Sequence, residues 1–486
     1  MSWLDRAVPA RMRRIALVAA DEALRDVLVR VADSAAVEIG SAGGEPAVPD
    51  AGAGTKGEAA RRLQRSGHQV PEAALSALRP DLDGLERAGR YDLLAGEAEL
   101  ESYAAAAARR SGASALAGWI PAGRLAALTA SVAEVGGAVV PLRYPPGVQP
   151  PTLAAGQRMK RLLSPLVQTY GTVPYADVDP AWLAWGSYVL MFGMMFGDVG
   201  EGVVLLGVAV ALRAGWPDWA RRFRRAWPFV GGAGAAATLF GLLYGECFGP
   251  TGLVPVLWLS PLDHTLTLLG VAAGAGVAML AGAYVLGTVN RWREGGWPSA
   301  LYAPSGVAGV AVFLGAGIMA GGWYFHLGLL LAGGGCLAMA GLALAAIGFL
   351  AEAGAGGAGR LQASVELFDL VVRLGSNVVS FTRLAAFGLT HAALGLIVWE
   401  GTRALWRHGG VFTVAAVIVF AAGTALAFSL EGLIAAIQAL RLEYYELFSR
   451  VFVTQGRPFR PWHVPTVPSP ATACGVCATS VKEDQT

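Results

Sequence analysis

The sequence predicts a multi-span α-helical membrane protein of about eight membrane helices, the last two long and tilted, with an N-terminal cytoplasmic α/β plus short coiled-coil domain. Of its 486 residues, 55% are hydrophobic and only 15% are charged, which is too apolar for an ordinary soluble protein. Apolar runs fill residues 181–450, whereas most charged residues lie in 1–180. We therefore expect a head at 1–180, a membrane domain at 181–453 and a disordered cytoplasmic tail at 454–486.

The head combines strand and helix signals. The apolar run Ile15–Ala20 is too short for a secretory signal, so we expect the head to stay in the cytoplasm. Two helical segments, about Glu58–Arg65 and Leu85–Arg110, predict a short antiparallel helical pair. The remaining periodicities predict strands at Ile15–Val18, Val37–Ile39, Ala115–Ile120 and Ala138–Leu142, and helices from Asp21 to about Ala32 and over Ala122–Val135.

Basic loops decide between two interpretations of the first apolar run, Ala181–Arg213. One bent span would leave a loop with five arginines outside the cell, which violates the positive-inside bias. A turn at Gly197–Gly200 gives two short helices instead and keeps that loop in the cytoplasm. We favour the turn, which predicts both termini inside. The arginines are Arg213, Arg221, Arg222, Arg224 and Arg225, and the later spans are about 227–248, 264–290, 300–323, 327–351, 362–405 and 411–447.

Polar residues follow one face of the apolar run Leu361–His408. At 100° per residue, six of them fall within about 40° of one line. An ionisable residue at this depth is costly and is read as functional. The six are Asp369, Arg373, Ser376, Ser380, Arg383 and His391.

The last apolar run carries a second polar stripe. Thr424, Glu431 and Gln438 recur every seven residues, and Arg441 lies within about a quarter turn of them. Each of the last two runs would be roughly 60–70 Å long, about twice the apolar thickness of a bilayer. They must tilt or protrude.

Several motifs in order along the chain resemble one family. The segment Ser376–Ala392, SNVVSFTRLAAFGLTHA, is similar to the arginine-bearing helix of the membrane stator of V/A-type rotary ATPases, called subunit a or subunit I. Phe192–Asp198 and Gly241–Gly249 resemble the family's first and second membrane signatures. Leu430–Gly432 and Leu440–Glu443 match its final helix. A composition rich in Arg, Ala and Gly suggests a bacterial genome, and the head resembles a shortened version of the family's head.

The resemblance implies a function for these charges. The family's stator forms two half-channels that carry H⁺ or Na⁺ to and from the carboxylates of a rotating proteolipid c ring. A fixed guanidinium at Arg383 would favour an ionised ring carboxylate and block direct leakage. The residues expected to serve ion translocation are Arg383, Arg441, Asp369, His391, Glu431, Ser376, Ser380, Gln438 and Glu443. The expected structural membrane motif is Gly197, Asp198, Glu201 and Glu246.

The resemblance also implies partners and a location. The head would bind peripheral stalks, and further partners would be the central-rotor or ring-cap subunit, the soluble ATPase sector and the bilayer of a bacterial plasma membrane. No lysine follows a glycine, so the chain has no P-loop and is expected to be non-catalytic by itself. We expect no cofactor, no metal and no nucleic acid.

Some alternatives stay open. A stand-alone secondary transporter or channel could also carry intramembrane charges, although it would have no use for the head. His391 could be a hydrogen-bonded core residue, and Asp198 fits a helix-end role better than proton transfer. Cys474 and Cys477 have dithiol spacing on the tail, which is weak evidence for metal or redox chemistry. The choice between H⁺ and Na⁺ and between pump and synthase also stays open.

Overall fold

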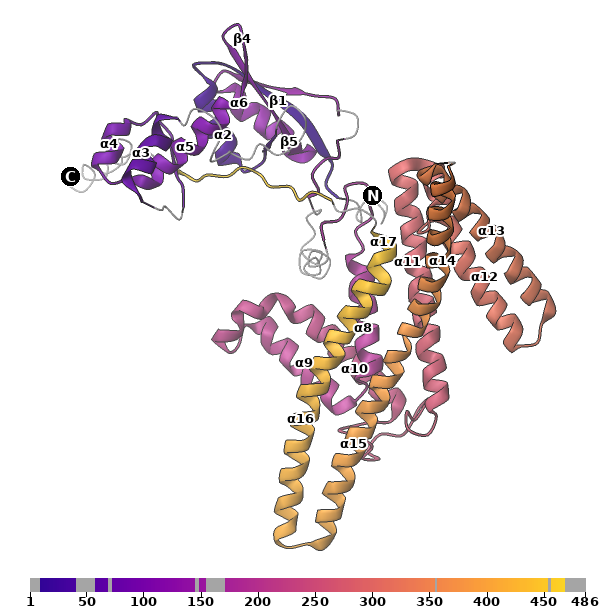
Figure 1. Cartoon of the computed structure of the whole chain (residues 1–486). Helices are drawn as coiled ribbons and strands as arrows, with labels where there is room; N and C mark the ends of the chain where they lie inside the picture. Colours follow the sequence, from indigo (N-terminus) through magenta and orange to yellow (C-terminus); the bar gives the residue numbers. More distant parts are fainter. Residues whose placement is uncertain are drawn as a thin grey trace. The chain divides into compact units, whose positions relative to one another are not determined.

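A computed structural model of the chain divides into two compact units, one formed by Pro9–Leu153 with Gly456–Thr486 and the other by Met1–Val8 with Ala154–Gln455 (Figure 1). We call the first the head and the second the helical unit. The structure describes residues 9–40, 57–68, 72–144, 148–153, 171–354, 356–452 and 456–467. Residues 171–180, expected in the head, lie in the helical unit, where Val178 N–H donates to Asn290 Oδ1 at 3.0 Å.

The head contains a five-stranded antiparallel sheet. Its order is β2-β5-β1-β6, with β4 paired to the free end of β5. Helices α2 and α6 pack together and bury Val27, Leu28, Leu128 and Val132. The expected strands and helices are therefore confirmed. Their bounds are β1 Met12–Ala20, α2 Leu24–Ser34, β2 Glu38–Gly40, β4 Ala108–Arg110, β5 Ala113–Pro121, η1 Ala122–Arg124, α6 Leu125–Ala133 and β6 Gly137–Pro141.

The helical part of the head differs from the expectation. α3 (Glu58–Ser66) packs against α5 (Tyr91–Ala105), as the predicted pair requires. The single helix expected over Leu85–Arg110 is wrong, because α4 (Leu82–Arg87) ends before Gly89, whose φ of 66° is left-handed. A residue without a Cβ takes that conformation at little cost and ends a helix.

The segment Gly456–Val467 belongs to the head rather than to a separate tail. β7 (Thr466–Val467) pairs in parallel with β3 (Leu75–Ser76). Trp462 is buried, donates its backbone N–H to Val37 O at 2.8 Å and its indole N–H to Glu99 at 2.9 Å. Burial of this aromatic ring explains why these residues pack instead of forming the expected disordered tail. Residues 468–486 lie outside the described residues.

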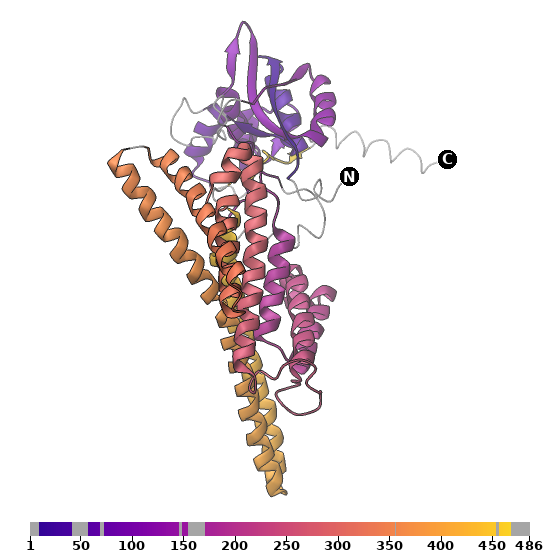
Figure 2. The same ribbon diagram turned by 90° about the vertical axis from the view of Figure 1, so that its right-hand side faces the viewer.

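The helical unit is a bundle of long apolar helices (Figures 1 and 2). Six helical stretches among the described residues are long and apolar enough to cross a membrane, and the last two have 52 and 41 residues. This confirms a multi-span helical membrane protein. The bounds are α8 Ala181–Met195, α9 Val199–Ala214, η2 Asp218–Ala226, α10 Trp227–Tyr244, α11 Thr265–Tyr302, α12 Val307–Tyr324, α13 Gly328–Ala353, α14 Gly357–Ser380, α15 Thr382–His408, α16 Val411–Leu442, η3 Glu443–Phe448 and α17 Ser449–Val451.

A turn divides the first apolar run, as the favoured interpretation predicted. α8 ends at Met195, and the Asp198 side chain caps α9. α9 then packs closely on α10: a Cβ on Gly202 would lie 2.5 Å from Thr238 N, and one on Gly241 would lie 2.3 Å from Val199 N. These glycines serve close helix packing. The side of the membrane on which the turn lies stays a prediction.

Two irregularities shape the end of the chain. The helix expected over Leu361–His408 is interrupted at Phe381, whose fully buried ring occupies space left by Gly276 on α11. α16 continues into η3, which is a π-helical segment. α15 and α16 lie side by side, and their connecting turn forms one extremity of the helical unit (Figures 1 and 2).

Candidate functional site

Arg383 forms a pair with a carboxylate on the last helix. It stands one residue after the start of α15, and its Nη2 lies 3.3 Å from Glu446 Oε1 on η3. Ser380 Oγ–H donates to the same carboxylate oxygen, and Arg383 Nε donates to Ser380 O at 3.0 Å. The Glu446 side chain is 9% exposed and that of Arg383 27%. A guanidinium is thus held at the edge of the bundle by a buried carboxylate and a backbone carbonyl.

Glu446 was missed by the sequence reasoning. The heptad from Thr424 to Gln438 says nothing of the positions after Leu442, where the π-helical segment η3 has more residues per turn than an α-helix. Such π-helical turns are frequent at functional sites. A signal was present, because Glu443 and Glu446 place two carboxylates within one turn of an otherwise apolar run.

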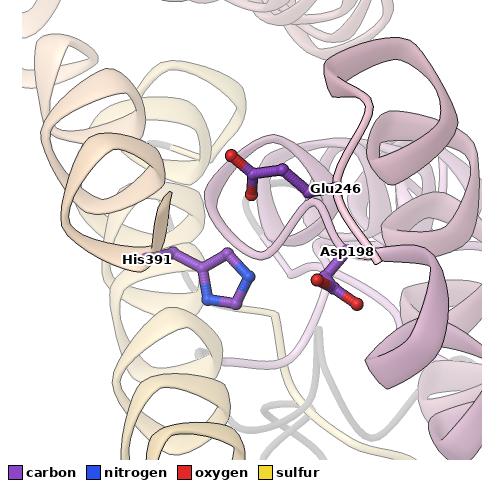
Figure 3. A group of neighbouring side chains, drawn as sticks. All are labelled: Asp198, Glu246 and His391. Atoms are coloured by element: carbon purple, nitrogen blue, oxygen red, sulfur yellow. The ribbon is translucent and has the colours of Figure 1, made fainter. Parts of the chain in front are cut away.

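His391 is the centre of a second group. Its ring is buried, with Nδ1 2.5 Å from Glu431 Oε2 on α16 and Nε2 4.0 Å from Glu201 Oε2 on α9. One donor atom each from Asp198, Glu246 and His391 lies within 4.8 Å of the other two, and Figure 3 shows the three side chains facing a common space. The structure therefore brings together two expected translocation residues and three residues of the expected membrane motif.

Asp198 holds the loop after α10 in place. Its Oδ1 accepts from Glu201 N–H at 3.0 Å and Phe248 N–H at 2.9 Å, and its Oδ2 accepts from Gly249 N–H at 2.9 Å. Three backbone donors on one carboxylate give a helix cap and a loop anchor. This geometry matches the helix-end role expected for Asp198. The turn residue Gly197 lies against Tyr244 of α10, since a Cβ there would be 2.6 Å from the ring.

Glu443 makes a separate contact deep in the bundle. The residue is 1% exposed, and its Oε2 accepts from Ser187 Oγ of α8 at 2.6 Å. Burial of a carboxyl group requires such a partner. Glu443 thus contacts α8 through Ser187.

Arg450 is a second residue that the sequence reasoning missed. It is buried on α17, and its guanidinium lies 5.5 Å from the centre of the Tyr284 ring. With the Asn377 amide oxygen turned toward it, Arg450 Nη2 donates to that oxygen at 3.0 Å. An arginine near the end of an apolar run was the available signal.

The remaining expected residues lie outside these groups, except that Arg441 interacts electrostatically with Glu446 of the Arg383 pair. Asp369 and Arg373 pair only with each other among the described ion pairs, at 2.6 Å, and their side chains are 48% and 67% exposed. Ser376 and Arg441 are exposed, and Arg441 lines an open hollow with Tyr444 and Tyr445. Gln438 Oε1 has no hydrogen-bond partner in the described part of the chain. The six-residue stripe is therefore divided: Asp369 is half-exposed and Arg373 and Ser376 are exposed, whereas Ser380, Arg383 and His391 have partners on α16 or η3.

Long apolar helices that enclose paired ionisable groups define an integral membrane protein with charges inside its spans. A sequence profile of the V-type ATPase 116 kDa subunit family matches residues 109–227. This match and the relatives below support assignment to the V/A-type ATPase subunit a/I family.

The relatives are themselves ATP synthase subunits. A-type ATP synthase subunit I of Aeropyrum pernix is 26% identical over 345 residues, which cover 61% of this chain and 49% of the relative. The Archaeoglobus fulgidus subunit I is 25% identical over 406 residues, covering 71% and 58%. V-type ATP synthase subunit I 2 of Treponema pallidum is 32% identical over 126 residues, covering 23% and 26%. The chain spans about half the length of the first relatives it matches.

Proposed function

We propose that the chain is the membrane stator of a V/A-type rotary ATPase and forms two half-channels that carry H⁺ or Na⁺ to and from the carboxylates of a rotating proteolipid c ring. The similarity to subunit a/I proteins supports assembly into a rotary ATPase complex. The stator role is supported by the partly exposed Arg383 guanidinium, which is held by Glu446 and Ser380. The chain is not catalytic in this proposal, and ATP is handled by the soluble ATPase sector.

Arg383 would act by exchanging carboxylate partners. A guanidinium stays protonated at any physiological pH and forms paired hydrogen bonds with a carboxylate. In the structure, Glu446 Oε1 lies 3.3 Å from Arg383 Nη2 and balances the charge of the guanidinium. A ring carboxylate that arrives ionised would compete for the same guanidinium, and a neutral one would not. The arginine thus favours the ionised form of the ring site and separates the two half-channels.

The groups on either side of Arg383 would supply the half-channels. His391 lies eight residues further along α15, about 12 Å away along the axis, and faces Glu431 and Glu201. In the other direction lie Ser380, Ser376 and Asp369, all before Arg383 in the chain. Hydroxyl, imidazole and carboxyl groups can relay ions through water. Arg441, Gln438 and Glu443 would shape the field beside the ring.

Copurification tests the complex. The purified protein should bring down a proteolipid ring, peripheral-stalk subunits bound to its head, and the central-rotor or ring-cap subunit that connects to the ATPase sector. Recovery as a stable monomer that transports ions by itself would instead support the transporter alternative and overturn the stator proposal.

Residue labelling tests the proposed orientation in a bacterial plasma membrane. We propose eight membrane helices with both termini cytoplasmic. In a variant without native cysteines, a cysteine at the exposed Trp219 should react with reagent only from the cytoplasmic side, and one at the exposed Pro255 only from outside. The reverse pattern would overturn this topology and leave the stator role to the copurification test.

A further inference from the structure

The segment that joins α9 to α10 exposes arginine and aromatic side chains together. Its main part is η2, and Trp216 lies just before η2. Trp216 and Trp219 are 74% and 70% exposed. Membrane proteins place tryptophan and arginine side chains at the level of the lipid headgroups. The exposed arginines of η2 are Arg221, Arg222, Arg224 and Arg225.

The charges of η2 are confined to part of its surface. η2 is a 3-10 helix, so residues three apart share a face. Ala220 is buried, and the face that it shares with Phe223 and Ala226 carries no charge. All four arginines lie on the other two faces, together with Trp219 and Asp218. Burial of Ala220 indicates that the uncharged face packs on α9 and α10, with which η2 is in contact, so the charged faces stay open to a partner.

The positive charge of this segment is not balanced within the protein. Asp218 is the only acidic residue between Glu201 and Glu246 in the sequence, and it pairs with Arg221 at 2.8 Å. No described ion pair includes the other three arginines of η2. Guanidinium groups without carboxylate partners are complementary to phosphate groups, which they bind through paired hydrogen bonds.

The place of η2 in the chain selects the kind of phosphate. η2 continues directly into α10, and Asp218–Tyr244 is one of the six stretches long and apolar enough to cross a membrane. α10 itself begins at Trp227 and has 18 residues, which gives a length of about 27 Å, close to the apolar thickness of a bilayer. A crossing by α10 therefore leaves η2 in the headgroup layer, among phospholipid phosphates.

We propose that η2 and Trp216 bind anionic phospholipids, with the four arginines on the headgroup phosphates and the indole rings among the headgroups. Four arginines and one aspartate leave a net charge of +3 on this segment, and each arginine near an anionic surface contributes about fivefold in affinity. The proposal rests on α10 crossing the membrane, and it depends neither on the stator role nor on the side that η2 faces. Lipids bound here would fix the depth of α9, which carries Glu201.

Native mass spectrometry of the purified full-length chain in detergent tests the proposal without any transport activity. The chain is titrated with phosphatidylglycerol, or with zwitterionic phosphatidylcholine that has the same acyl chains, and the apparent Kd of the bound lipid is compared. We expect phosphatidylglycerol to bind at least about tenfold more tightly. Inorganic phosphate in large excess should not displace it, because free phosphate lacks the acyl chains that hold a lipid against the helices.

Matched double variants locate the lipid. Arg222→Gln with Arg225→Gln removes two charges from one face of η2 and should weaken phosphatidylglycerol binding at least about tenfold. Arg222→Lys with Arg225→Lys keeps both charges and should stay within about threefold of the original affinity, because lysine also binds phosphate as a point charge. Arg403→Gln with Arg407→Gln, on exposed residues of α15, is the control and should leave the affinity unchanged.

The proposal is overturned if phosphatidylcholine binds as tightly as phosphatidylglycerol, or if the Gln variants of η2 and α15 lose affinity equally. Displacement of the lipid by inorganic phosphate would instead show a site for free phosphate. Unchanged phosphatidylglycerol affinity in the Gln variant of η2 would also overturn the proposal and leave these arginines to an acidic protein. All substituted side chains are exposed, so an unchanged Tm is expected. The assay uses the chain alone, and copurification of a ring would stand whatever its result.

Discussion

The charged residues of α14 and α15 look alike in the sequence, but their partners lie in different places. On α14, Asp369 and Arg373 pair locally across one helical turn and remain half exposed. On α15, Arg383 and His391 reach across to Glu446 and Glu431 and are mostly buried. Local exposed pairs contribute little to stability, whereas buried pairs between helices are costly to break. Ion transport should therefore be more sensitive to substitutions on α15 than to substitutions on α14.

The largest contrast is expected between two arginines. Arg383→Lys should abolish ATP-driven acidification or Na⁺ uptake in vesicles that contain the assembled complex, because an ammonium cannot reproduce the planar, permanently charged fork. Arg373→Lys should retain more than half of the transport, since it conserves an exposed local pair.

Assembly must be checked in both variants, because loss of the complex would also remove transport. Arg441→Lys, on an exposed residue of α16, is expected to leave partial transport. Normal transport in the Arg383→Lys complex would end the claim that α15 carries the essential charge.

The ring of Phe381, between α14 and α15, is fully buried. Replacing this fully buried ring by Ala leaves a cavity next to Gly276 and should lower the free energy of unfolding by about 3–5 kcal/mol. Thermal unfolding in detergent should show the loss as a lowered Tm. Phe368→Ala on α14, where the ring is 71% exposed, is the matched control and should change Tm little. Equal losses of Tm in the two variants would show that the buried Phe381 ring contributes no more to stability than the exposed Phe368 ring.

The partner of Arg383 can be removed without a large change in shape. Glu446→Gln keeps the hydrogen bond from Ser380 but removes the charge, and we expect coupled transport to fall about tenfold, equivalent to about 1.4 kcal/mol. Glu400→Gln, exposed and paired with Arg403 on α15, should be neutral. A Glu446→Gln complex with unchanged transport would show that the ring carboxylate alone positions Arg383.

The smallest effect is expected on α14. Asp369→Asn removes an exposed pair of the i, i+4 type, worth about 0.2–0.5 kcal/mol, and should change transport by less than twofold. A larger loss, measured in the same vesicles, would show that the charge of Asp369 is needed in the half-channel proposed for it, and the contrast between α14 and α15 would narrow.

Composition predicted the multi-span class, the basic loops predicted the turn before α9, and helical periodicity predicted that Arg383 and His391 share a polar face of an otherwise apolar segment. These follow from short-range patterns. The division of the stripe could not be predicted, because the partners of Ser380, Arg383 and His391 lie on α16 and η3, 66, 63 and 40 positions away in the chain. The directions of the Glu446 and Arg450 side chains depend on the π-helical turn of η3, which a regular α-helical period does not predict. The packing of Trp462 on the head likewise requires a contact with Val37, far away in the sequence.

The return of residues 456–467 to the head has a mechanical consequence. Residues 9–153 and 456–467 lie in the head and the helices between them in the helical unit, so the chain connects the two units both before and after these helices. A single connection lets its two ends swivel about backbone single bonds, whereas two connections resist twisting, since one must wind around the other. If a rotating ring exerts a torque on the helical unit, both connections carry it. Trp462 and β7 then hold the second connection in the head against this torque. Cutting the chain after residue 455 would leave the helical unit free to rotate about the remaining connection.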